Sequence, residues 1–96
     1  MHVILWRFRV RPGREREFEA AYAPDGAWAS LFKKDGAYIG SELLRATDGT
    51  YLTLDRWDSR EAFEAFRARH AAEYDAMDTR FDPLLEDETP LGAVDI

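Results

Sequence analysis

Hydrophobic residues near the start of the chain recur at every second position. Within residues 2–10 the even-numbered positions include Ile4, Trp6 and Phe8, whereas the odd-numbered positions pass from aliphatic residues to arginines. Side chains of an extended strand point alternately to its two faces, so this period predicts a strand over residues 2–10 with apolar groups on both faces. A Pro-Gly pair at residues 12–13 predicts the end of this strand.

The spacing of apolar residues then lengthens to one helical turn. Phe18 and Tyr22 lie four residues apart, which predicts a helix that starts near Arg14. The Pro-Asp-Gly sequence at residues 24–26 interrupts that helix. An apolar stripe at helical spacing resumes with Trp28, Leu31 and Phe32. We therefore expect a first helical region in two pieces.

Two strand-like segments, residues 38–45 and 50–57, follow the helical region. An Asp-Gly pair stands between them at residues 48–49. This pair is a strong signal for a tight turn, so the two segments are predicted to form an antiparallel hairpin. Neither face of the second segment is purely polar, because leucines alternate there with Tyr51, Thr53, Asp55 and Trp57.

A second and longer helical pattern begins at residues 58–59, where Asp and Ser are both suitable N-caps. Its apolar stripe has intervals of three or four residues and consists of Phe63, Phe66, His70, Tyr74, Met77 and Phe81. The stripe predicts one continuous helix up to Pro83, which disfavours continuation. We expect the acidic run 86–88 to be solvent-exposed and residues 91–96 to form a short last strand.

The predicted order of elements is β-α-β-β-α-β within a single domain of residues 1–96. This is the split arrangement of the ferredoxin-like α+β fold, with both helical regions on one face of an antiparallel sheet. The other sheet face would then carry Val3, Leu5, Leu52 and Leu54. Each is worth roughly 1.5–3 kcal/mol when buried, so a second copy of the chain is the expected cover. We predict a homodimer that packs sheet to sheet.

Composition narrows the classes of partner and chemistry. Thirteen Lys and Arg against nineteen Asp and Glu give a net charge of −6, which repels phosphate backbones and anionic lipids. No segment approaches the roughly 20 apolar residues that span a bilayer. Cysteine is absent, and only His2 and His70 could offer imidazole ligands. We expect a cytoplasmic protein with no nucleic-acid or membrane partner and no metal.

Three segments resemble one known family over nearly the whole chain. They are the end of the first strand at residues 7–13, the aromatic opening of the second strand at residues 38–40, and residues 51–59 leading into Phe63. Trp57-Asp58-Ser59 before a helix is the most distinctive of these features. The sequence is similar to the antibiotic biosynthesis monooxygenase (ABM) domain family, whose members are dimeric α+β barrels.

The resemblance implies a cofactor-independent monooxygenase that oxidises a hydrophobic phenolic molecule to a quinone-type product. Trp57 takes the position of a pocket tryptophan of the family, but we find no counterpart for the asparagine of the quinone-forming members. In the haem-degrading members an asparagine stands where this chain has Trp6. Their helical histidine falls near Arg67 rather than at His70, so haem degradation is the least favoured function. The alternative class is a non-catalytic domain that binds a small ligand or serves a stress response.

Three Trp, four Tyr and six Phe exceed what so short a chain needs for its core. As catalytic candidates we take Trp57, which would stack on a flat substrate, and His70, which would accept a phenol proton with a nearby tyrosine as the alternative. The structural alternatives are a core role for Trp57 and a hydrogen-bonded buried role for His70, the commoner use of such a histidine. The candidate substrate-binding residues are Trp6, Phe8, Trp28, Phe32, Phe63, Phe66 and Tyr74.

Structural roles are also open for these binding candidates. Core packing is the commoner role for Trp6 and Phe8, which would reduce any cavity. Trp28 and Phe32 either form a lid over a pocket or hold a short helix in place. The strand arginines 7, 9 and 56 either orient an anionic substrate or, as is usual, pair with acids such as Glu42 and Asp55.

Overall fold

The computed structural model describes all 96 residues as an α+β fold with one four-stranded sheet. Its elements are β1 (His2–Val10), α1 (Glu15–Tyr22), α2 (Ala27–Phe32), β2 (Tyr38–Arg45), β3 (Tyr51–Trp57), α3 (Arg60–Arg69), α4 (Ala71–Phe81), a 3₁₀ turn η1 (Asp82–Leu84) and β4 (Leu85–Asp95). The strands are antiparallel in the order β2-β3-β1-β4. The predicted fold class is confirmed.

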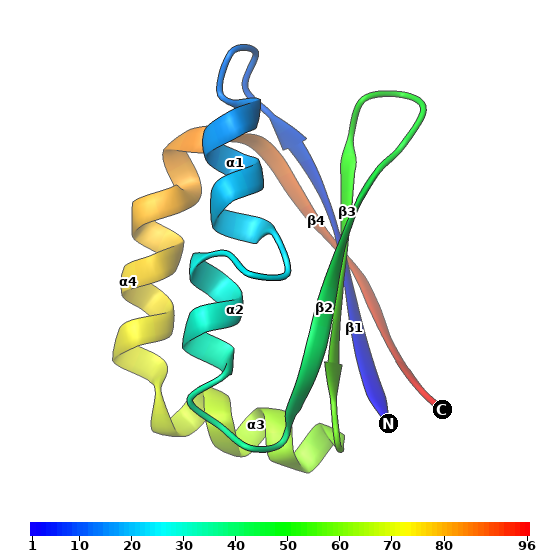
Figure 1. Ribbon diagram of the computed structural model, residues 1–96, viewed down its shortest axis with the longest axis vertical. Coiled ribbons are helices and arrows are strands. Elements are labelled where there is room, and N and C mark those ends of the chain that lie inside the picture. Colours follow the sequence, from blue (N-terminus) through cyan, green and yellow to red (C-terminus); the bar gives the residue numbers. More distant parts are fainter.

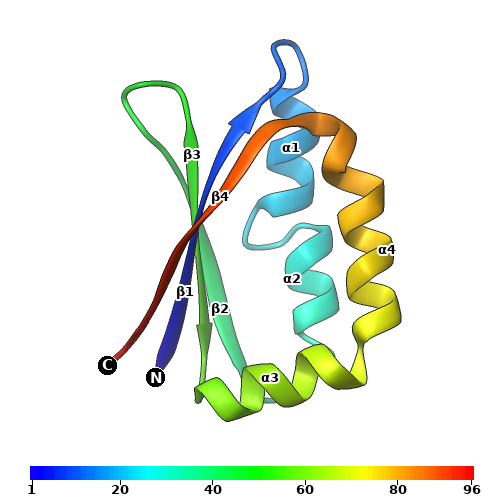
Figure 2. The same cartoon turned by 180° about the vertical axis from the view of Figure 1, so that it is seen from behind.

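All helices cover the same face of the sheet. Figures 1 and 2, seen from opposite sides, show α1 and α2 stacked end to end over the strands, α4 beside them, and α3 crossing below. The even-numbered residues of β1 and the odd-numbered residues of β3 face these helices and join the aromatic core around Phe8, Tyr51 and Trp57. The opposite sheet face has no helix.

The break between α1 and α2 is fixed at Gly26 by lack of space. A side chain there would place its Cβ 2.4 Å from the carbonyl oxygen of Ala20 and 2.7 Å from that of Ala21. The backbone of Gly26 is extended, with φ −83° and ψ −170°, so its conformation alone does not require glycine. Glycine is needed because α2 begins in contact with the last turn of α1.

The second helical region is also two helices, which corrects the prediction of one continuous helix. α3 ends at Arg69 and α4 begins at Ala71, with His70 between them at φ −111° and ψ 28°. The side chain of Ser59 caps the start of α3 by accepting a hydrogen bond from the amide of Ala62 at 3.1 Å. The break turns the chain so that α3 closes one end of the helical layer and α4 runs along its side (Figure 2).

β4 is longer than the predicted segment 91–96 and begins already at Leu85. It pairs with β1 along its whole length, from Leu85 opposite Val10 to Asp95 opposite His2. The register shifts at Leu91, which is an extra residue between two paired positions. Pro90 is tolerated because β4 is an edge strand.

The outer sheet face carries the aliphatic side chains that the alternation places there. Val3 faces Val94, and Leu5 faces Leu54, in neighbouring strands. Val3 is buried, but Val94 is 51% exposed and Leu44 of β2 is 47% exposed. Arg56 pairs with Glu42 on this face at 2.8 Å, as predicted for strand arginines. An apolar surface therefore lies open on the side without helices.

Candidate functional site

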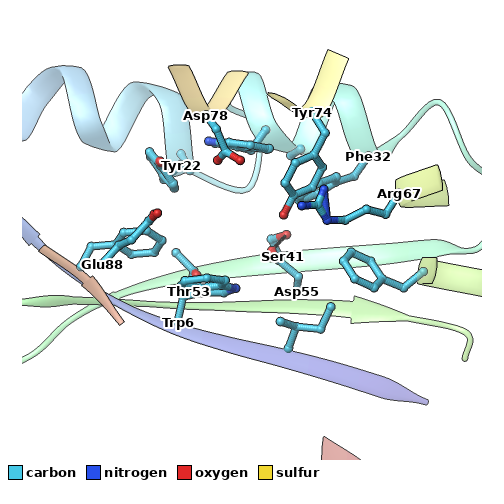
Figure 3. A pocket seen from close by; sticks show the side chains of 16 residues that line it. Trp6, Tyr22, Phe32, Ser41, Thr53, Asp55, Arg67, Tyr74, Asp78 and Glu88 are labelled. Atoms are coloured by element: carbon cyan, nitrogen blue, oxygen red, sulfur yellow. Dashed lines mark hydrogen bonds between the residues drawn. The ribbon is translucent and has the colours of Figure 1, made fainter. Parts of the chain in front are cut away.

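A cavity of about 260 Å³ lies between the sheet and the helical layer. Every α-helix and every strand contributes to its lining (Figure 3). Its volume lies just below the roughly 300–1,000 Å³ typical of small-molecule sites. Six of the nine predicted site residues line it: Trp6, Phe8, Trp28, Phe32, Phe63 and Tyr74. The walls are therefore mainly aromatic, which suits a small flat guest.

Trp57 lies behind this cavity rather than at its surface. Its side chain is fully buried, and its ring contacts Phe32 at 5.6 Å and Phe63 at 5.4 Å between centroids, both edge to face. Phe66, also fully buried, packs against it from α3 at 4.9 Å. Neither Trp57 nor Phe66 lines the cavity. The residue expected to stack on a guest instead supports two residues that do line it.

His70 is also absent from the cavity lining. It occupies the break between α3 and α4, where Nδ1 lies 2.9 Å from a carboxylate oxygen of Glu73. Its ring lies 4.9 Å from that of Phe66. The apolar stripe correctly places the imidazole beside buried aromatic rings, but the break directs it away from the cavity.

The polar centre of the cavity is Asp55, which the sequence offered only as one possible partner of a strand arginine. On β3 the side chain of Asp55 shares the helix-facing side with Thr53 and Trp57, whereas Arg56 points to the other side. Ser41 lies directly opposite Asp55 in the register of β2 and β3. Its hydroxyl donates a hydrogen bond to Oδ1 of Asp55 at 2.6 Å.

A β-bulge in β2 extends this contact to a third residue. Tyr38 pairs with Trp57 and Gly40 with Arg56, so Ile39 is an extra residue in β2. The extra residue places Tyr38 and Ser41 on the same face, although three positions separate them. The Tyr38 hydroxyl lies 2.5 Å from the Ser41 hydroxyl. Because Ser41 donates its single proton to Asp55, Tyr38 is the donor to Ser41.

Burial raises the pKa of Asp55 from its ordinary value of 3.8 to about 6, although the hydrogen bond from Ser41 acts in the opposite direction. Asp55 forms no ion pair. Its charged form is therefore held by one hydroxyl in a largely apolar cavity. Such a carboxyl group accepts protons more readily than an exposed one.

Tyr74 and Arg67 lie across the cavity from Asp55. In Figure 3 the side chains of Tyr74 and Asp55 point toward one another, with Arg67 beside them. The guanidinium carbon of Arg67 lies 4.0 Å from the ring centre of Tyr74, a cation–π contact. Burial raises the pKa of Tyr74 to about 12, so its hydroxyl is a hydrogen-bond donor at neutral pH.

Two further carboxylates, Asp78 of α4 and Glu88 of β4, line the other end of the cavity near Tyr22 (Figure 3). Partial burial raises the pKa of each, and the two carboxylates repel one another. Both residues are otherwise solvent-exposed, so they lie at the rim. Glu88 belongs to the acidic run 86–88, which is solvent-exposed as expected, and the pairing of β4 with β1 also turns Glu88 toward the helices.

Some signals for these missed residues are present in the sequence. The alternation of residues 51–57 places Asp55 on the same face as Trp57, and a carboxylate on a buried face is a candidate functional group. The signal for Ser41 and Tyr38 is weak: Gly40 within the strand suggests a bulge, but it does not show which side chains the bulge aligns. No three His, Cys, Asp or Glu side chains lie together in a metal-binding arrangement, so we assign no metal ligands.

The fold and the cavity define the class of this protein. It is a small ferredoxin-like domain with an aromatic-walled, acid-containing cavity between its sheet and its helices. The antibiotic biosynthesis monooxygenase family model matches residues 1–76. The chain therefore belongs to the antibiotic biosynthesis monooxygenase family.

Solved structures with the same fold include SnoaB, a cofactor-independent oxygenase from Streptomyces nogalater. It is 23% identical, with a TM-score of 0.78 over 99% of this chain and 91% of its own. A protein from Bordetella bronchiseptica named for the same family is 20% identical, with a TM-score of 0.76 over 99% of this chain and 95% of its own. Rv0793 from Mycobacterium tuberculosis is 21% identical, with a TM-score of 0.70 over 99% of this chain and 96% of its own.

The search of curated proteins gives no sequence match. None of the helices combines the length and apolar character required to cross a membrane.

Proposed function

We propose that the protein is a cofactor-independent monooxygenase that oxidises a hydrophobic phenolic molecule, bound in the cavity, to a quinone-type product. The observation that carries this proposal is the cavity of about 260 Å³, whose aromatic walls enclose a proton-accepting carboxyl group. Membership of the family and the shared fold with SnoaB, described as a cofactor-independent oxygenase, support it.

The proposed reaction uses dioxygen as its only co-reactant. A ring methylene of the substrate's keto tautomer loses one proton, and the resulting phenolate transfers one electron to dioxygen. The substrate radical and superoxide combine to a peroxide anion, which takes up a proton to give the hydroperoxide. Loss of the second C–H proton then breaks the O–O bond and releases water. In sum, CH2 and O2 give C=O and H2O, so the substrate loses four electrons and dioxygen gains them.

The aromatic candidates divide into two roles in this proposal. Trp6, Phe32 and Phe63 are wall residues that contact the substrate. Trp57 is a positioning residue, because its edge-to-face contacts hold Phe32 and Phe63 from behind. We assign His70 no part in the proton transfer in this proposal, since it does not line the cavity.

We also propose that the protein is a homodimer that packs through the outer sheet face. Leu5, Leu54, Leu44 and Val94 form an aliphatic surface there, and Leu44 and Val94 are about half exposed in the single chain. Covering this surface with a second copy would remove it from water, which stabilises the pair.

Oxygen consumption tests the proposed function. The protein, freed of metal and flavin, is mixed with anthrone, and the oxygen uptake above the rate without protein is followed by electrode. We expect about one dioxygen per anthrone, from the balance above, and anthraquinone as the product. Ala29→Leu, which fills the cavity from α2, should lose this activity.

A matched substitution controls for the fold of that variant. Ala72→Leu adds the same atoms on an exposed position of α4 and should retain the wild-type rate. Circular dichroism of both variants checks that each is folded. Wild-type protein that binds anthrone with no oxygen uptake would instead support the alternative of a non-catalytic binding domain.

A further inference from the structure

The charge around the cavity is strongly unbalanced. Three carboxylates, Asp55, Asp78 and Glu88, belong to its lining, against the single guanidinium of Arg67. Arg67 is exposed and lies over the ring of Tyr74, and it forms no ion pair with any of the three. A guest that carries its own negative charge would therefore meet net repulsion, above all at the end where Asp78 and Glu88 lie.

Asp55 differs from the two rim carboxylates in position and in hydrogen bonding. It projects from the middle of the sheet, whereas Asp78 and Glu88 are largely exposed. Ser41 occupies its Oδ1, and no protein group donates a hydrogen bond to its Oδ2. Oδ2 is not sealed from solvent, and Asp55 lines the cavity, so this oxygen is open to the cavity. Oδ2 is therefore free to accept a hydrogen bond or a proton from a bound molecule.

We propose that Asp55 is the catalytic base of this site. Its Oδ2 accepts the proton of an uncharged hydroxylated aromatic molecule or of its keto tautomer. The rim carboxylates of Asp78 and Glu88 exclude aromatic molecules that carry a negative charge. This inference rests on the proposed monooxygenase function and names its base and its class of substrate. The proton moves from the substrate to Oδ2, which leaves a neutral carboxyl group and a phenolate. Asp55 returns the proton to the peroxide anion, which gives the hydroperoxide and leaves the carboxylate ready to accept the second C–H proton.

The hydrogen-bonded chain from Tyr38 through Ser41 acts on Asp55 as a positioning device. Ser41 fixes Oδ1, so that Oδ2 is the free atom, and it stabilises the ionised form that a base requires. Removing the Ser41 hydroxyl should therefore raise the pKa of Asp55 and shift the acidic limb of the pH–rate profile upward. The other groups facing Asp55 keep their charges in that variant: Tyr38, Arg67, Tyr74, Asp78 and Glu88.

Binding tests the substrate class independently of turnover. Two probes with the same ring system, 2-naphthol and 2-naphthoate, are titrated at neutral pH against the tryptophan fluorescence of the protein. We expect naphthol to bind about tenfold or more tightly than naphthoate, and Asp78→Asn with Glu88→Gln to reduce that preference. Equal affinity of the two probes for the wild-type protein would overturn the charge selection.

Turnover tests the base. Asp55→Asn keeps the shape and the contact with Ser41, so naphthol affinity should change by less than about threefold while kcat for anthrone falls by about 100-fold. Glu86→Gln, which removes the same charge from an exposed position, should leave both values unchanged. Ser41→Ala should shift the pH profile without a matching loss of kcat at its plateau.

The outcomes separate the two proposals. A wild-type protein that consumes no oxygen refutes the monooxygenase function and the catalytic role of Asp55 with it, while the naphthol preference remains a valid result about the cavity. If the wild-type protein consumes oxygen and the Asp55→Asn variant has the same kcat, Asp55 is not the base. The monooxygenase function is then still supported.

Discussion

Replacing Asp55 with asparagine should make the protein more stable at neutral pH while removing its activity. Burial raises the pKa of this carboxyl from 3.8 to about 6, so the fold favours its protonated form. A tenfold change in acidity corresponds to about 1.4 kcal/mol, and the ionised carboxylate therefore costs about 3 kcal/mol of folding free energy. Asparagine carries no charge and retains the acceptor for Ser41.

The pH dependence of the folding stability shows whether the ionisation of Asp55 causes the difference between the two proteins. Well below pH 3.8 the carboxyl is protonated in both the folded and the unfolded chain, and it then costs nothing. As the pH rises the unfolded chain loses its proton first, so wild-type stability falls until the folded carboxyl ionises near its raised pKa of about 6. The gain in free energy of unfolding from Asp55→Asn should therefore grow between pH 3.8 and about pH 6 and remain constant at higher pH.

Urea unfolding at about pH 3 and about pH 8 measures this difference. We expect a gain of about 1–3 kcal/mol at the higher pH, because the new amide N–H group needs a partner of its own, and almost none at the lower pH. Protomer concentration is held constant, since a dimer would make stability depend on it. Glu86→Gln serves as the control for lost charge. If the free energy of unfolding of Asp55→Asn does not exceed that of the wild type at the higher pH, the ionised Asp55 does not destabilise the fold. A gain of equal size at both pH values would lead to the same conclusion.

Three further outcomes follow from the packing. Trp57→Phe should destabilise the fold by about 1–3 kcal/mol and lower kcat through its cavity-wall neighbours, as thermal unfolding and oxygen uptake would report; an unchanged rate contradicts the positioning role. Leu54→Asp should give a monomer in sedimentation, and an undissociated dimer would place the interface elsewhere. His70→Ala should leave the pH–rate profile in place, and a shifted limb would return the imidazole to the proton transfer.

Local patterns predicted most of the fold. The strand over residues 2–10 has the predicted bounds, because a period of two persists through all nine positions. The hairpin also follows prediction, since Gly49 adopts φ +88° and Asp48 accepts a hydrogen bond from the amide of Thr50 at 2.9 Å. The break at His70 escaped prediction because the apolar intervals of three and four residues continue across it without interruption.

The candidate site was predictable in its walls but not in its polar centre. Aromatic residues such as Trp6 and Phe32 are large and lie on helix-facing positions, so their place near a cavity follows from periodicity. The alignment of Tyr38 with Ser41 depends on a bulge that only strand pairing reveals. Glu88 faces the cavity because β4 pairs with β1 as far as Leu85, a long-range contact that local sequence does not encode.

The close approach at Gly26 lets one position outside the cavity affect the placement of a cavity wall. A methyl group there would collide with the carbonyl oxygens of Ala20 and Ala21, so α2 would have to move away from the end of α1. α2 carries Trp28, Ala29 and Phe32, so the whole wall would move with it and the lining would keep its chemistry. The positions of these three lining residues thus depend on the distance between two helix ends as well as on the residues themselves.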